Sequence, residues 1–114
     1  MDNFSTNEEN GVLIHQINLS RATAEYAREF KETLERYLHR DKYRIVVDFQ
    51  QCEFTDSSFL SVLISTLKSL IKKGGNLKLV CARNDIESML EATGLSKIFE
   101  IYNSQGEAIN SKWG

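Results

Sequence analysis

The spacing of apolar residues changes in the middle of the chain, where it predicts a strand followed by a helix. Ile45 to Phe49 is a short β-branched run, which is typical of a buried strand. Between residues 60 and 71, apolar side chains recur at steps of three and four, as on one face of a helix. These are Leu60, Leu63, Ile64, Leu67, Leu70 and Ile71. Residues 50–59 are therefore predicted to lead from the strand into the helix.

The N-terminal part of the chain has the pattern of a β-hairpin. Phe4 to Thr6 is a candidate edge strand, and Val12 to Leu19 is the strand that returns beside it. The segment Asn7 to Gly11 ends in Asn-Gly, which readily supplies the positive φ angles of a hairpin turn. Apolar side chains occupy both odd and even positions of the second strand. We therefore expect both faces of this strand to be covered.

The remaining elements follow from the same reasoning. Ser20 is a good N-cap for a helix from about Arg21 to Leu38. Lys72 to Asn76 is a helix end and turn, with lysines near the negative end of the helix dipole. The other expected elements are strands over Tyr43 to Phe49, Leu77 to Ala82 and Ile98 to Tyr102, a short helix capped by Asn84 or Asp85, and a terminal helix through Ala108 and Ile109.

The order of these elements predicts an α/β fold. Crossover helices between the later strands imply parallel pairing, whereas the N-terminal hairpin adds an antiparallel edge. We therefore expect a mixed β-sheet with crossover α-helices. At 114 residues the chain is expected to be one domain, 1–114, with a core from about residue 12 to residue 102.

Composition excludes several classes of partner. A formal net charge of −2 gives no general attraction for nucleic acid or for anionic membranes. No apolar run approaches the length of a membrane span, and the polar, acidic N-terminus is unlike a signal peptide. Cys52 and Cys81 adjoin predicted strands without ligand spacing, which is typical of buried, reduced thiols. We expect a cytoplasmic protein, with a monomer favoured, that binds no nucleic acid and no membrane.

Residues for catalysis or metal binding are not grouped in the sequence. His15 and His39 fall in a predicted strand and at a predicted helix end, and neither has a reason to approach a serine. Asp48 ends a strand, as the phosphoaccepting aspartate of a receiver domain does. The acidic pair that would hold Mg²⁺ in such a domain is missing after the first strand. The sequence therefore indicates no enzyme, no catalytic residue, no cofactor and no metal site.

Ser57 and Ser58 stand where the loop becomes a helix. Free backbone N–H groups and the positive end of the helix dipole favour negative charge at such a place. A serine hydroxyl, or the Asp56 carboxylate before it, can simply cap the helix. Alternatively, a serine there can carry a phosphate, which would make the domain a switch. The residues alone leave both interpretations open.

With this loop placed, the chain resembles a STAS domain, and in particular the bacterial anti-sigma factor antagonists. The strand Ile45–Phe49 leads through a short loop into Asp56-Ser57-Ser58, which is similar to the family's strand, loop and Asp-Ser-Ser/Thr pattern. Gly74-Gly75 and Thr93-Gly94-Leu95 then follow in the family's order. The resemblance covers roughly Val12 to Tyr102.

The chain departs from the family pattern at two places. Phe59 stands where the family usually has glycine after the serine pair. Asn18-Leu19-Ser20-Arg21 stands where the family often has Gly-Glu-Leu/Ile-Asp. Because Leu60 already begins the predicted buried stripe, we expect Phe59 to be partly exposed, where an aromatic ring is a good interface anchor. The alternative is a core Phe59 that packs beneath the loop.

The resemblance implies a partner switch in transcription regulation. In the family, the unphosphorylated domain binds an anti-sigma factor that is also a serine kinase, which releases the sigma factor. The kinase phosphorylates the first serine of the pair, and a PP2C-type phosphatase reverses the reaction. Carried over by motif, the phosphoacceptor is Ser57, with Ser58 as the runner-up. The expected partner-facing residues are Thr55, Asp56, Ser58, Phe59, Ser61 and Val62.

Two other functions remain open from the sequence. The chain could be a STAS scaffold that does not switch, in which the serine is only a helix cap. It could also be a small-ligand or nucleotide-binding module in a larger signalling assembly, because a loop at a strand–helix junction can hold a phosphate-bearing ligand.

Overall fold

The structure is a computed structural model in which residues 2–81 and 84–113 are described. The expected end of a strand at Ala82 lies outside the described residues. The possible helix cap by the Asn84 side chain lies outside them as well.

Five strands form the central sheet, in the order β1 (Phe4–Glu9), β2 (Val12–Ile17), β4 (Arg44–Asp48), β6 (Asn76–Val80) and β7 (Ile101–Tyr102). β1 and β2 form an antiparallel hairpin, and each later neighbour pairs in parallel. The hairpin turn consists of Asn10 and Gly11, with φ of 52° and 78°, so β1 continues past the expected end at Thr6. The predicted mixed sheet is confirmed.

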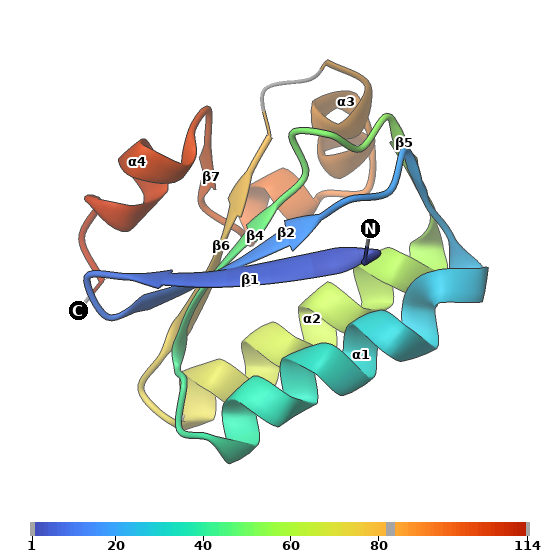
Figure 1. The fold of residues 1–114 in the computed structure, drawn as a ribbon. Coiled ribbons are helices and arrows are strands. Elements are labelled where there is room, and N and C mark those ends of the chain that lie inside the picture. The colour runs from blue at the N-terminus through green and yellow to red at the C-terminus, as the bar shows by residue number, and fades with distance from the viewer. Residues whose placement is uncertain (1, 82–83, 114) are drawn as a thin grey trace.

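Helices α1 (Ala24–His39) and α2 (Ser57–Lys72) lie side by side on one face of the sheet, and the short α4 (Gln105–Ile109) covers the other (Figure 1). α3 (Asn84–Ala92) packs near the strand β5 (Phe54–Thr55). Most of the hydrophobic core lies between the sheet and these three longer helices, and Cys52 and Cys81 are buried there as expected.

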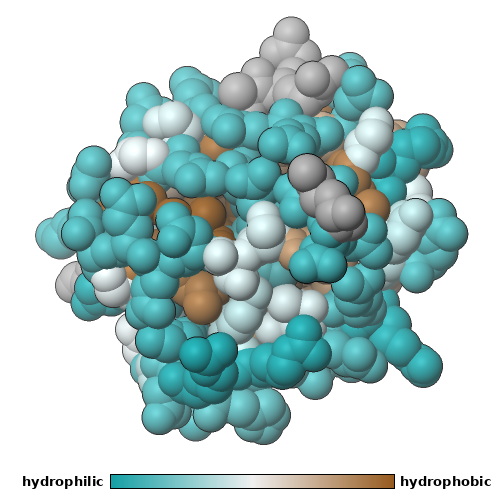
Figure 2. Space-filling view, in the orientation of Figure 1, coloured by the Kyte–Doolittle hydropathy of each residue, from teal (hydrophilic) through white to brown (hydrophobic). Residues whose placement is uncertain are grey.

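The face seen in Figure 2 is mainly hydrophilic, and apolar residues appear on it only in small patches. Within the described ranges, no helix combines the length and the apolar character that crossing a membrane requires.

Other expected boundaries are also wrong, most clearly those at the start of α1 and in the last strand. α1 begins at Ala24, with Thr23 as its N-cap residue, rather than at Arg21 after Ser20. Arg21 and Ala22 instead form the two-residue strand β3 (Arg21–Ala22), which pairs in parallel with β5. The last strand is shorter than predicted, because Leu95–Lys97 is a 3₁₀ helix and Ile98 is 56% exposed. At residues 21 and 22, pairing with a distant strand overrides local propensity.

A lysine lies in the middle of the sheet, on the face that α4 covers. Lys78 is fully buried. Its ammonium donates hydrogen bonds to Ser111 Oγ at 2.8 Å and to the carbonyl of Lys112 at 2.6 Å. It also lies 4.3 Å from the centre of the Trp113 ring and 3.5 Å from the Glu100 carboxylate. The C-terminal segment thus supplies most of the partners that a buried charge requires.

The face toward α1 contains a buried histidine. His15 of β2 stacks with Phe4 and Phe30, at centroid distances of 5.1 and 5.5 Å, and its Nδ1 lies 2.9 Å from the Tyr37 hydroxyl. Its Nε2 is buried without a hydrogen-bond partner among the described residues. Burial, and after it the charge of Arg36, lowers the pKa of His15 from 6.5 to about 3. His15 is therefore neutral in the folded protein near neutral pH.

We predict that His15 makes the folded state sensitive to acid. Because its folded pKa lies below its unfolded pKa, the unfolded chain takes up the proton first as the pH falls. This contribution to stability is complete above pH 6.5 and is lost as the pH falls toward about 3. Over that window the folding equilibrium constant should fall about tenfold per pH unit from this group. Urea unfolding across this pH range should show a shallower pH dependence for His15→Gln than for the wild type.

His39→Gln is the matched control, because His39 is exposed at the end of α1. This variant should follow the wild-type pH dependence. An identical pH dependence for His15→Gln and the wild type would show that burial does not keep His15 neutral.

Candidate functional site

One carboxylate holds the start of α2. Asp56 is the N-cap residue of α2, and its Oδ1 accepts a hydrogen bond from the Phe59 N–H at 3.2 Å. Its Oδ2 accepts another, at 2.8 Å, from the N–H of Ala24, the first residue of α1. The first N–H groups of a helix need such acceptors. Asp56 thus caps two helices, and Thr23 makes no side-chain cap of its own.

The pairing of β3 with β5 anchors the same loop. Thr55 is fully buried, and its hydroxyl donates a hydrogen bond to the carbonyl of Ala22 at 2.9 Å. The carbonyl of Ser20 accepts hydrogen bonds from the N–H groups of Glu53 and Phe54, at 2.7 and 3.1 Å. The Ser20 hydroxyl, expected to cap a helix, donates to the Glu53 carboxylate at 3.0 Å instead. Two separate segments of the chain are therefore joined beneath the start of α2.

Three serines are exposed above this junction. Ser57 and Ser58 are the first residues of α2, and Ser61 lies one turn later. The Ser61 hydroxyl donates to the carbonyl of Ser57 at 2.8 Å. Asp56 is half-buried. The structure thus brings the predicted phosphoacceptor, Ser57, together with Asp56, Ser58 and Ser61.

Three residues that were expected at the surface are buried. Thr55 and Phe59 are fully buried, and Val62 is 8% exposed. The predicted exposure of Phe59 is wrong, because α2 packs against α1 as well as against the sheet, and its buried face is correspondingly wide. Conversely, Ile71 was expected in the buried stripe and is 60% exposed. The apolar period alone carried no information about the second packing surface.

Phe59 belongs to an aromatic cluster between the two helices. Its ring stacks on Phe30 of α1, with centroids 4.1 Å apart and planes inclined by 7°. Phe4 of β1 lies 6.2 Å from it, centroid to centroid. Stacked rings of this kind add to the stability gained from burial alone. The alternative considered above, a core Phe59 beneath the loop, is the correct one.

A shallow depression adjoins Ser57. Its volume is about 170 Å³, and it is lined by Ser57, Leu60, Ser61, Ile64, Thr93 and Leu95. Ser58 does not line it. Sequence reasoning missed Thr93 and Leu95 as site residues, because they belong to the segment after α3 and no local pattern brings that segment beside α2.

The exposed polar groups at the start of α2 are the hydroxyls of Ser57, Ser58 and Ser61. His15 is buried among aromatic rings, and His39 lies at the opposite end of α1 from Asp56. In the described part of the chain, no group of three or more His, Cys, Asp or Glu side chains is placed to hold a metal ion. Asp48 is buried and accepts hydrogen bonds from the Gln50 N–H and from the Gln105 amide.

A mixed sheet with paired helices on one face, and a helix that begins at Asp56-Ser57-Ser58 with both serines exposed, agree with the STAS pattern. The STAS domain family matches residues 3–108, and the chain belongs to that family. A curated relative, the anti-sigma-B factor antagonist of Listeria monocytogenes, is 33% identical over 81 residues, which make up 71% of each chain.

Two solved structures share the fold. An anti-sigma factor antagonist from Mycobacterium paratuberculosis has a TM-score of 0.84 at 20% identity, over 93% of this chain and 89% of that one. The phosphorylated form of the Bacillus cell fate determinant SpoIIAA has a TM-score of 0.73 at 14% identity, over 94% of this chain and 96% of that one.

We predict that Asp56 stabilises both helices that it caps. Asp56→Ala removes both acceptor oxygens and should lower the free energy of unfolding by about 2 to 3 kcal/mol, against about 1 kcal/mol for an ordinary single cap. Asp56→Asn keeps one acceptor oxygen and should lose about half as much. Urea denaturation of the two variants gives both values.

Ser104→Ala provides the reference for a single cap, because among the described residues the Ser104 hydroxyl caps one helix, by accepting a hydrogen bond from the Glu107 N–H at the start of α4. If Asp56→Ala costs no more than Ser104→Ala, the hydrogen bond to Ala24 contributes nothing to stability.

We further predict that Phe59→Ala lowers the free energy of unfolding by about 3 to 5 kcal/mol, because it leaves a cavity against Phe30. The control on the same helix is Ile71→Ala, which should cost less than about 0.5 kcal/mol, because Ile71 is 60% exposed. Chemical denaturation measures both. Equally small losses would place the Phe59 ring outside the core.

Proposed function

We propose that this protein is an anti-sigma factor antagonist that changes partners when Ser57 is phosphorylated. The unphosphorylated chain binds a cytoplasmic anti-sigma factor that is also a serine kinase, and so releases a sigma factor. The kinase phosphorylates Ser57, and a PP2C-type phosphatase removes the phosphate. The proposal is supported above all by the exposed Ser57 at a helix start fixed by Asp56. The name of the Listeria relative, an anti-sigma-B factor antagonist, agrees with it.

Ser57 is favoured over Ser58 by its surroundings. Both hydroxyls are exposed, but only Ser57 lines the depression formed with Leu60 and Leu95. A phosphate on Ser57 therefore changes the surface where an apolar side chain of a partner could be seated. Thr55 is a poor candidate for phosphorylation, because its hydroxyl is buried and donates a hydrogen bond to the Ala22 carbonyl.

The physical effects of a phosphate differ inside and outside the domain. It adds about −1.5 to −2 charges. Within the chain, the positive end of the α2 dipole stabilises this charge, so the fold has no need to rearrange. Toward a partner, the phosphate must lose water against an apolar contact beside the Asp56 carboxylate. A loss of about 2.8 kcal/mol of interaction energy lowers affinity roughly 100-fold.

The depression argues against the ligand-binding alternative. Pockets for small ligands usually enclose about 300 to 1,000 Å³, and the depression beside Ser57 has about 170 Å³. The volume of the depression does not distinguish a switch from a scaffold that does not switch. Such a scaffold would bind its partner equally well with or without negative charge at Ser57. A binding measurement therefore separates the scaffold from the switch.

The test uses the purified anti-sigma factor kinases encoded in the same genome. In isothermal titration calorimetry, the wild type and Ser57→Ala should bind one of them with similar affinity, and Ser57→Asp should bind about 100-fold more weakly. Ser69→Asp is the matched control, because Ser69 is exposed about 18 Å further along the same helix. It should bind like the wild type.

Mass spectrometry of the intact protein completes the test. After incubation with the kinase and ATP, the wild type and Ser58→Ala should carry one phosphate, and Ser57→Ala none. Phosphate found only on Ser58 or Thr55 would show that Ser57 is not the phosphorylated residue. Wild-type affinity of Ser57→Asp would favour the scaffold, and a lack of binding to every such kinase would overturn the proposed function.

A further inference from the structure

Arg21 is fixed at the edge of the surface that carries Ser57. It is the first residue of β3 and pairs in register with Phe54 of β5. The Ser20 carbonyl before it accepts two backbone hydrogen bonds from residues 53 and 54, and Ala22 after it is fully buried. The backbone of Arg21 is therefore attached to the loop that ends in Ser57.

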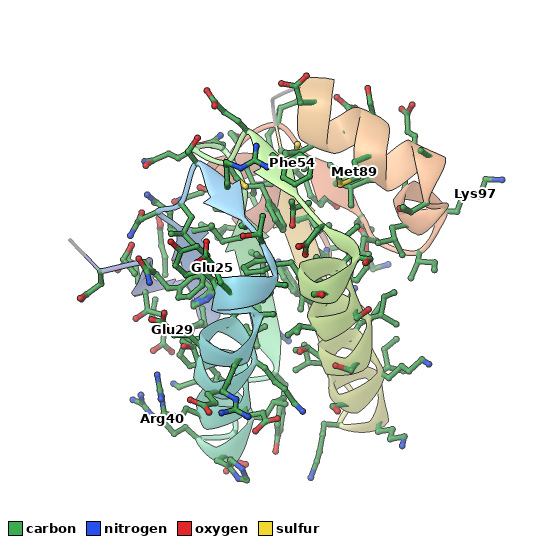
Figure 3. The ribbon with its side chains drawn as sticks, turned by 90° about the vertical axis from the view of Figure 1, so that its right-hand side faces the viewer. Glu25, Glu29, Arg40, Phe54, Met89 and Lys97 are labelled. Carbon is green, nitrogen blue, oxygen red and sulfur yellow. The ribbon has the colours of Figure 1, made fainter. Side chains whose placement is uncertain are left out.

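The side chain of Arg21 is exposed, yet its position is restricted. Its guanidinium carbon lies 4.4 Å from the centre of the Phe54 ring. Phe54 is half-buried and lies beside Met89 of α3, at the end of the molecule where α2 begins (Figure 3). A guanidinium that is held over an aromatic ring by cation–π attraction still has N–H donors for other partners.

These N–H groups have no acceptor within residues 2–81 and 84–113. The ion pairs found there are made by Lys31, Lys42 and Lys78, and the Arg21 guanidinium makes no hydrogen bond to another described residue. A guanidinium has five N–H donors, and two of them can bind one carboxylate side by side. Arg21 is thus a positioned cation whose donors face solvent.

The distance to Ser57 places Arg21 inside any interface of ordinary size. Only Thr55 and Asp56 separate Phe54 from Ser57 in the chain, and Arg21 is the strand neighbour of Phe54. The Cα atoms of Arg21 and Ser57 are therefore less than about 15 Å apart. A standard interface covers about 800 Å² on each partner, which is a patch about 16 Å in radius. A protein seated over Ser57 also reaches Arg21.

We propose that Arg21 is a specificity residue that binds a carboxylate of the anti-sigma factor at the β3 edge of the interface. This inference rests on the proposed function, because the same partner must cover Ser57. The matching partner surface has an apolar side chain for the depression at Leu60 and Leu95, and an Asp or Glu for Arg21. Because stacking already restricts the guanidinium, binding costs it little conformational entropy. A related anti-sigma factor with Lys or Arg at that place would be repelled.

The phosphate of Ser57 itself is the competing acceptor for this cation. If Arg21 paired with that phosphate, replacing Arg21 would change the properties of the phosphorylated chain alone. If Arg21 binds the partner, the replacement changes the affinity of the unphosphorylated chain. The two cases are therefore separated by measuring both forms.

The test measures affinity for the purified anti-sigma factor that binds the wild type. Arg21→Glu reverses the charge, and Arg21→Gln removes it with little disturbance of the fold. Arg44→Glu makes the same charge change at an exposed position at the start of β4, remote from the Asp56 loop. At low salt, Arg21→Glu should bind at least about tenfold more weakly, Arg21→Gln about threefold, and Arg44→Glu within about twofold of the wild type. At about 1 M salt the deficit of Arg21→Glu should shrink, because charges are screened beyond about 3 Å.

A charge swap identifies the partner group. Among variants of the anti-sigma factor in which single Asp or Glu residues become Lys, one should restore the binding of Arg21→Glu. The inference would be overturned by equal affinities of Arg21→Glu and Arg44→Glu, or by the lack of any variant that restores binding. Weak binding of Ser57→Asp to the anti-sigma factor would still support the proposed function in that case.

Two other outcomes also decide the matter. Unchanged affinity of unphosphorylated Arg21→Gln, together with a shifted ³¹P NMR titration of its Ser57 phosphate, would assign Arg21 to the phosphate and overturn the inference. A wild-type chain that binds no anti-sigma factor would overturn the proposed function and the Arg21 contact with it.

Discussion

The two hydrogen bonds accepted by the Asp56 carboxylate fix the geometry on which the functional surface depends. One joins this side chain to its own helix at Phe59, and the other joins it to Ala24 at the start of α1. Separating α1 from α2 at this end breaks the hydrogen bond from the Ala24 N–H, and because this bond is exposed, water replaces only part of what the charged acceptor contributes. Ser57 is the next residue, so its position is set by the packing of two helices rather than by a mobile loop.

Aromatic packing supports this junction from below. Phe59 occupies the position where the STAS pattern usually has glycine, and its ring fills the space against Phe30 and Phe4. The same cluster contains His15, which is kept neutral by burial. The departure from the family pattern therefore bears on the stability of the helix pair, and not on the surface offered to a partner. The departure that does reach the surface is the one at Arg21, where the chain has a cation.

The elements with a clear period were predictable from the sequence, and so was the exposed Ser57. The Asn10-Gly11 turn, the buried strand from Ile45 and the helix after Ser57 all follow from local chemistry. The rest depends on contacts between distant segments. Arg21 and Ala22 form a strand only because residues 54 and 55 lie beside them, and the cap of α1 comes from Asp56 rather than from Ser20 or Thr23. A lysine in a strand is ordinarily expected to be exposed. Lys78 is buried because the distant C-terminal segment supplies its hydrogen-bond partners.

The proposed surface separates the choice of partner from the control of binding. Two unit charges about 15 Å apart in water interact by only about 0.3 kcal/mol, and physiological salt reduces this further. A phosphate on Ser57 therefore has little effect on a carboxylate bound at Arg21, and its effect must arise where it loses water, at the apolar depression lined by Leu60 and Leu95. On the proposed surface, the charge at Arg21 would act in both phosphorylation states and would distinguish one anti-sigma factor from another. The proposed phosphate on Ser57 would act on any partner that Arg21 binds, because every such partner would pack against the same depression.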